Sequence, residues 1–259
     1  MSHNLPTGAE PTAADLDRPL YTPIKRRSFF MYAGATAGAT ALVLAGCGKD
    51  DNNSPGMVNV GMGDVGVLNY AYALEQLEAD FYTQVRTGSY YMGLAAGSAE
   101  KLILDDLYYH EVIHRDFFKA AITGAGATPI KALQTVYPSG TFSSKNSVLT
   151  AAKAFEDLGV SAYNGAGQYI SSPGYLYLAG KIVSVEARHA AIIRDLLLEN
   201  SFVANDVVSL TSDNNSSLAT NNVGKAGSSL EKSKTPSEVV AIANTYLADG
   251  SKLDVSGIR

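Results

Sequence analysis

Thiols and clusters of basic residues are what this 259-residue chain has least of. Its only cysteine is Cys47, which excludes an intramolecular disulfide, a zinc ribbon and an iron–sulfur cluster held by several thiolates. The formal net charge is -5, and no basic cluster follows Cys47, which argues against a nucleic-acid partner. Histidine is also scarce, because only three of the four histidines follow Cys47.

Two of those three histidines follow a glutamate by three positions. The pairs are Glu111 with His114 and Glu186 with His189. A given histidine would have a glutamate at that spacing by chance only about 4% of the time. Residues at i and i+3 share one face of a helix, so each pair can bind one metal ion.

Two further glutamates interrupt apolar helix faces. In residues 68–87 the apolar positions recur at helical spacing, and Glu75 falls on their stripe. In residues 147–171 a second apolar stripe carries Glu156. Both glutamates are therefore predicted to face the interior of a helical bundle.

A tyrosine follows each of these glutamates by seven residues, two helical turns further along the same face. The pairs are Glu75 with Tyr82 and Glu156 with Tyr163. The chain thus reads as a twofold repeat, in which a helix with Glu and Tyr precedes a helix with Glu-x-x-His. The two tyrosines are candidate catalytic residues, since they can donate hydrogen bonds to ligands or hold a radical. A purely structural role in the core is the alternative.

Two neighbouring residues leave alternatives open. Glu78 lies about 60° around the helix from Glu75 and can replace it as a ligand, or it can be a solvated surface charge. The seven-residue spacing to a tyrosine favours Glu75. His110 points about 100° away from Glu111 and is interpreted as a surface or inter-helix residue.

The charge of this arrangement predicts metal ions. Four buried glutamates without partners would cost several kcal/mol each in lost solvation. Two divalent cations would neutralise them, and carboxylates with one imidazole per metal suit iron or manganese. In bundles of this kind two helices each supply one Glu and two supply Glu-x-x-His. The sequence offers all six ligands.

The segments LNYAYALEQLEADFY, HEVIHRDFF and EARHAAIIR resemble the ferritin-like di-metal carboxylate superfamily, and most closely its secreted, desiccation-related group. The resemblance covers roughly residues 64 to 200. It implies two iron or manganese ions bridged by Glu111 and Glu186. Glu75 and Glu156 are then terminal carboxylates, and His114 and His189 each bind one metal. Such sites activate oxygen or peroxide, oxidise ferrous iron or dismutate peroxide.

The N-terminal residues indicate export. The stretch Lys25 to Phe30 (KRRSFF) is typical of a twin-arginine signal, and an apolar run follows it. Residues 44–47 (LAGC) are similar to a lipobox, so Cys47 is the predicted lipidation site, and lipidation would leave no catalytic thiol. An uncleaved membrane anchor is the alternative. We expect a lipoprotein anchored at a membrane, in the periplasm or at the cell surface.

The expected fold is all-α: an antiparallel four-helix bundle of the ferritin-like kind, with one long crossover and an irregular C-terminal extension. Pro and Gly place the crossover within residues 123–145, and a short helix is expected after Thr235. The expected divisions are a signal peptide over 1–47, a tether over 48–63, the bundle over 64–200, and a flexible segment with a short helix over 201–259.

Three functions are compatible with these features. The first is a stress-protective oxidoreductase that acts on small oxidants or ferrous iron. The second is a manganese-catalase-like peroxide dismutase. The third is a non-enzymatic envelope protein, related to stress or desiccation, in which the metals hold the bundle together or are sequestered. A lipid-tethered N-terminus argues against a closed storage shell, whereas a smaller homo-oligomer stays possible.

Overall fold

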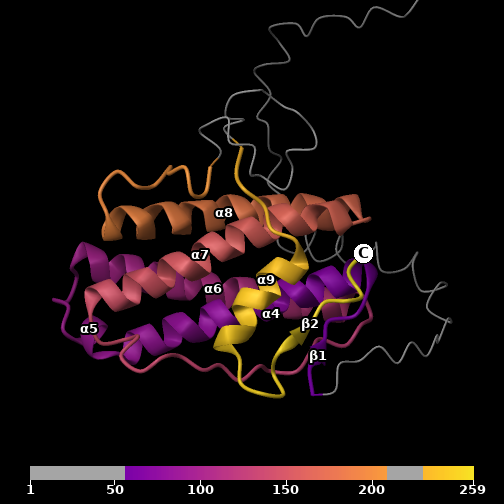
Figure 1. The fold of residues 1–259 in the computed structure, drawn as a ribbon, viewed down its shortest axis with the longest axis horizontal. Coiled ribbons are helices and arrows are strands. Elements are labelled where there is room, and N and C mark those ends of the chain that lie inside the picture. Colours follow the sequence, from indigo (N-terminus) through magenta and orange to yellow (C-terminus); the bar gives the residue numbers. More distant parts are fainter. Residues whose placement is uncertain (1–55, 209–229) are drawn as a thin grey trace, which may run out of the picture. The chain divides into compact units, whose positions relative to one another are not determined.

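Four long helices dominate the computed structural model, which describes residues 56–208 and 230–259. The bundle is formed by α4 (Gly63–Thr87), α6 (Ala99–Gly124), α7 (Lys145–Ala166) and α8 (Pro173–Leu197) (Figure 1). The predicted all-α bundle is therefore confirmed. The expected signal and lipidation residues, including Cys47, lie outside the described residues.

The helices pack as two antiparallel pairs. Helix α4 packs along α6, to which it is joined through the short helix α5 (Ser89–Met92), and α7 packs along α8 after the turn η1 (Gly167–Tyr169). One long connection, residues 125–144, runs back along the bundle from the end of α6 to the start of α7 (Figure 1). This is the expected single crossover.

The start of α7 and that of α8 have clear local causes. The Ser144 side chain accepts a hydrogen bond from the Ser147 backbone N–H, and the Ser147 side chain accepts one from the Ser144 backbone N–H. Ser172 caps α8, and Pro173 occupies its first turn, where no backbone N–H is required. These caps fix where the Glu156 and Glu186 helices begin.

Polar side chains on one face of α4 hold the crossover in place. The bonds run from Ile130 N to Asn69 Oδ1 (3.0 Å), from Leu133 N to Gln76 Oε1 (3.0 Å) and from Thr135 Oγ1 to Asp80 Oδ2 (2.6 Å). The crossover backbone thus finds partners that water would otherwise supply. The crossover is held against α4 as a result.

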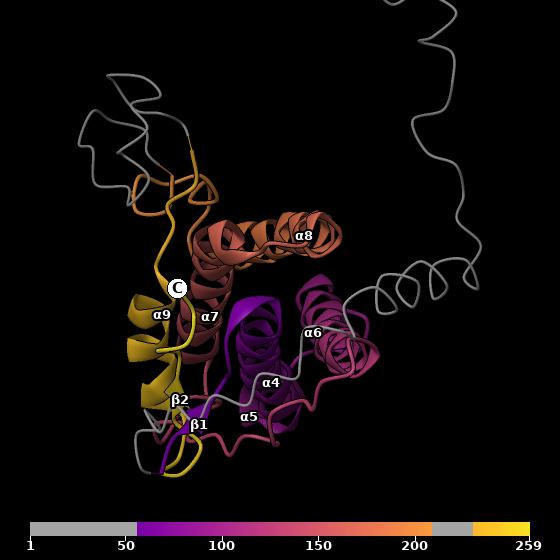
Figure 2. The ribbon, with the colours of Figure 1, turned by 90° about the vertical axis from the view of Figure 1, so that its right-hand side faces the viewer.

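The C-terminal segment packs against the bundle. Helix α9 (Pro236–Ala243) contacts α7 and continues into η3 (Asn244–Tyr246), and β2 (Leu253–Asp254) pairs in parallel with β1 (Val58–Asn59) (Figure 2). A Cβ on Gly165 would lie 1.8 Å from the Lys234 carbonyl oxygen, so this approach requires glycine. Residues 230–259 are thus ordered by contacts with α7 and β1, which sequence patterns do not reveal. The expected tether over 48–63 likewise contains packed residues from Val58 onward.

A buried ion-pair network joins the far end of α8 to its surroundings. Arg194 is only 2% exposed, and its guanidinium donates to Asp157 (2.7 and 2.8 Å) and to Asp206 (3.1 and 2.7 Å).

Within the described ranges, no helix has the length and apolar content needed to cross a membrane.

Candidate metal centre

All six predicted ligands meet at the centre of the bundle. One donor atom from each of Glu75, Glu111, His114 and Glu186 lies within 4.8 Å of the others, and so does one from each of Glu111, Glu156, Glu186 and His189. The two clusters share Glu111 and Glu186, the glutamates to which the resemblance gives the bridging role. Each of the four long helices contributes to the site.

Each histidine makes its shortest contact with the glutamate of the other Glu-x-x-His motif. His114 Nδ1 lies 2.8 Å from Glu186 Oε1, but 3.5 Å from Oε2 of its own neighbour Glu111. His189 Nδ1 lies 2.8 Å from Glu111 Oε1 and 3.6 Å from Glu186 Oε2. Each imidazole is therefore closest to the glutamate of the other helix. The twofold repeat of the sequence is thus also a twofold arrangement in space.

The donor atoms of the site are arranged to bind metal ions and not to form hydrogen bonds with one another. Glu75, Glu111, Glu156 and Glu186 are 0% exposed. Among the described residues, both oxygens of Glu111 and Glu186, and Nδ1 of His114 and His189, have no aligned hydrogen-bond partner despite the short approaches. Unpaired buried polar atoms are costly, and a cation between them would satisfy their lone pairs together. The oxygen and imidazole donors suit iron or manganese.

The electrostatics of the metal-free site are strongly coupled. Burial alone would lower the pKa of His114, but the surrounding Glu111, Glu186 and Glu75 raise this pKa to about 12. Burial would raise the pKa of Glu111, but the two imidazoles beside it lower this pKa to about 2. Burial also raises the pKa of Glu156, to about 7. In the metal-free protein the imidazoles therefore hold protons that metal binding must displace.

Each candidate tyrosine supports a glutamate of the other half of the repeat. The Tyr82 hydroxyl on α4 donates to Glu156 Oε1 on α7, and the Tyr163 hydroxyl on α7 donates to Glu75 Oε1 on α4. The sequence places each tyrosine on the face of its own glutamate, but the bonds cross between helices. The second oxygen of each glutamate, Oε2, is left facing an imidazole at 3.5 Å. The tyrosines thus orient the carboxylates.

A fifth glutamate, Glu78, also points inward. It is 3% exposed, so its interpretation as a solvated surface charge is wrong. Burial raises its pKa well above the usual value. Glu78 belongs to neither four-residue cluster, whereas Glu75 belongs to one. A Cβ on Gly159 would lie 2.9 Å from Glu78 Oε1, so the glycine of α7 makes room for this carboxylate.

His110 has a contact that the sequence does not reveal. Its Nδ1 lies 2.8 Å from His189 Nε2, and the two rings stack at 5.1 Å with an interplanar angle of 19°. His189 therefore turns Nδ1 toward the carboxylates and Nε2 toward His110. A partner on the outer nitrogen fixes the orientation of a ligating imidazole. Helical spacing correctly places His110 off the ligand face, but the approach of α8 decides what it touches.

The fold and the site together define a four-helix bundle with a buried carboxylate and histidine centre that is compatible with metal binding. Residues 63–199, just over half of the chain, match the ferritin-like domain family, and the chain belongs to this family. No curated protein matches the sequence.

Proposed function

We propose that this protein binds two iron or manganese ions and uses them for redox chemistry on oxygen, peroxide or ferrous iron. Glu111 and Glu186 would contribute to the sites of both ions, and the remaining donors would be Glu75 and His114 at one ion and Glu156 and His189 at the other. The main support is the set of buried, unpaired donor atoms in two overlapping clusters. Four glutamates match the charge of two divalent cations.

The protein residues would prepare the centre for this chemistry. A bound metal pair supplies one-electron redox steps with small oxidants. Their burial would keep bulk water away from the carboxylates, and the hydroxyls of Tyr82 and Tyr163 would hold the terminal glutamates in place. Either tyrosine is also a candidate for electron transfer, because each touches a carboxylate of the centre.

Export and lipid anchoring form part of the same proposal. The twin-arginine stretch at residues 25–30 and the lipobox-like residues 44–47 support a periplasmic or cell-surface lipoprotein with a role in stress or desiccation. Palmitate labelling of the full chain tests this location: wild type should incorporate the label and Cys47→Ser should not. Equal labelling of both would contradict lipidation at this cysteine.

One observation favours a non-enzymatic alternative. The four glutamates of the clusters are fully buried, which also suits metals that hold the bundle together or are sequestered. In that case metal would raise the free energy of unfolding, but wild type would consume neither oxygen nor peroxide. The manganese-catalase-like alternative predicts oxygen release from peroxide by the manganese form.

A pair of matched variants tests the proposal. Glu186→Gln removes a shared carboxylate of both clusters, whereas Glu199→Gln changes an exposed glutamate just beyond α8. Wild type and Glu199→Gln should bind two metals and react with oxygen or peroxide, and Glu186→Gln should lose both properties. Full metal binding by Glu186→Gln would refute the assigned centre. Metal binding without turnover in wild type would favour the structural role.

A further inference from the structure

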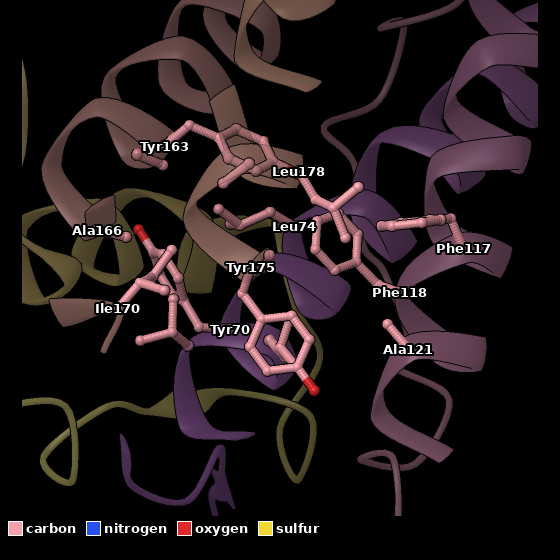
Figure 3. Close-up of a pocket in the computed structure, with 15 residues that line it drawn as sticks. Tyr70, Leu74, Phe117, Phe118, Ala121, Tyr163, Ala166, Ile170, Tyr175 and Leu178 are labelled. Carbon is pink, nitrogen blue, oxygen red and sulfur yellow. The ribbon is translucent and has the colours of Figure 1, made fainter. Parts of the chain in front are cut away.

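An apolar cavity of about 30 Å³ lies between all four long helices (Figure 3). Its lining comes from Leu74 and its neighbours on α4, from Phe117, Phe118 and Ala121 on α6, from Ala162, Tyr163 and Ala166 on α7, and from Tyr175, Leu178 and Ala179 on α8. The lining is almost entirely hydrocarbon. The metal centre does not explain why the bundle leaves this space open.

One tyrosine ring connects this cavity with the centre. The Tyr163 side chain forms part of the cavity wall, and its hydroxyl donates to Glu75 in the first cluster. Two other wall residues are also close to the cluster in the chain: Leu74 precedes Glu75, and Phe118 follows His114 by about one helical turn. Only this wall, which includes the Tyr163 ring, would therefore lie between a molecule in the cavity and the cluster.

The chemistry of the wall selects against polar occupants. The volume exceeds the roughly 10–15 Å³ that one water needs, but a buried water also needs two to four polar partners. The Tyr163 hydroxyl is already bonded to Glu75. Among the described residues the buried Tyr70 hydroxyl has no hydrogen-bond partner, and one hydroxyl can give a single water only one of the bonds that it needs. Water and peroxide would lose more hydrogen bonds here than they gain.

We propose that this cavity binds dioxygen and holds it next to the metal centre. The inference rests on the proposed function, because it names oxygen, not peroxide, as the small oxidant that reaches the centre by this route. A small apolar diatomic molecule loses little by leaving water for such a space and gains contacts with the wall.

Xenon, an apolar probe, tests the cavity without any turnover. Crystals of the metal-loaded protein under xenon pressure should show an anomalous peak between Tyr163 and Phe118. Ala121→Leu should abolish the peak, because it fills the cavity from α6, whereas Ala120→Leu should keep it, because Ala120 is exposed on the same helix. Ordered water in the cavity, or no xenon in wild type, would overturn the proposal.

Kinetics test whether oxygen uses the cavity. Stopped-flow oxidation of the ferrous-loaded protein by oxygen should slow by at least about tenfold in Ala121→Leu, and oxidation by peroxide should stay unchanged. Ala179→Leu fills the opposite wall on α8 and gives a second test if the first variant folds poorly. Equal rates with oxygen in wild type and both variants would overturn the proposal. A wild type that binds xenon but no metal would instead refute the proposed function.

Discussion

Replacement of Gly159 by alanine would put a methyl group into the carboxylate centre. The added Cβ would lie 2.9 Å from Glu78 Oε1 and 3.7 Å from Glu186 Oε2. Glu78 is only 3% exposed, so its carboxylate cannot turn into open solvent. Overpacking of this kind costs about 1–3 kcal/mol. The exchange of glycine for alanine in a helix returns about 1 kcal/mol, so we expect a net loss of about 0–2 kcal/mol.

Gly180→Ala is the matched control. Gly180 lies inside α8, and a Cβ there would meet no atom within 4 Å. This variant should gain about 0.5–1 kcal/mol from helix propensity alone. Urea denaturation of the metal-free proteins should therefore separate the two variants by about 0.5–3 kcal/mol. Metal titration should show weaker binding only for Gly159→Ala, because Glu78, which must move, lies beside Glu186 of the two clusters.

If Gly159→Ala were as stable as Gly180→Ala and bound metal with wild-type affinity, Glu78 and Glu186 would not lie against the α7 backbone at this glycine. The inward position of the fifth glutamate would then be wrong.

Three further predictions concern the surroundings of the centre. His110→Ala should weaken metal binding by about 10–100-fold in equilibrium titrations, whereas Lys119→Ala on the same helix should not, and equal affinities would contradict the orienting contact. Arg194→Met should lower the free energy of unfolding by about 1–3 kcal/mol, because it removes the buried guanidinium that pairs with the half-buried Asp157 and the exposed Asp206. In wild type the pKa of Asp206 is lowered to about 2 by Arg194, so the ion pair stabilises the fold above the ordinary pKa of an aspartate. This stabilisation is lost as the pH falls toward 2. An equal pH midpoint of acid unfolding in wild type and variant would contradict this. Metal affinity should rise with pH between 5 and 8, because the pKa of His114 is raised to about 12 and its proton must leave; calorimetry showing no proton release would contradict it.

Periodicity and spacing predict the bundle and the inward faces well, because both follow from the geometry of single helices. Glu75 and Glu156 interrupt apolar stripes, and the structure buries both of them. The Glu-x-x-His spacing similarly predicts that each motif presents two donors on one face. Contacts between helices are different, since they depend on how α8 lies against α6 and α4 against α7.

Five such contacts could not be predicted from one sequence. The partner of each tyrosine is the glutamate of the other half of the repeat, and His110 meets His189 only because α6 and α8 approach there. The position of Glu78 depends on the space at Gly159, a glycine whose role appears only when α4 faces it. The pairing of β1 with β2 joins segments almost two hundred residues apart, with only two residues on each side. No local pattern specifies a pairing of that kind.

The central claim is a pair of redox-active metals held by Glu75, Glu111, His114, Glu156, Glu186 and His189. Crystals of the protein expressed with iron and manganese, measured with anomalous scattering at both absorption edges, test this claim most directly. We expect two peaks, one within each four-residue cluster, with Glu111 and Glu186 between them. A single peak elsewhere, or less than one equivalent of iron plus manganese in the purified protein, would contradict it.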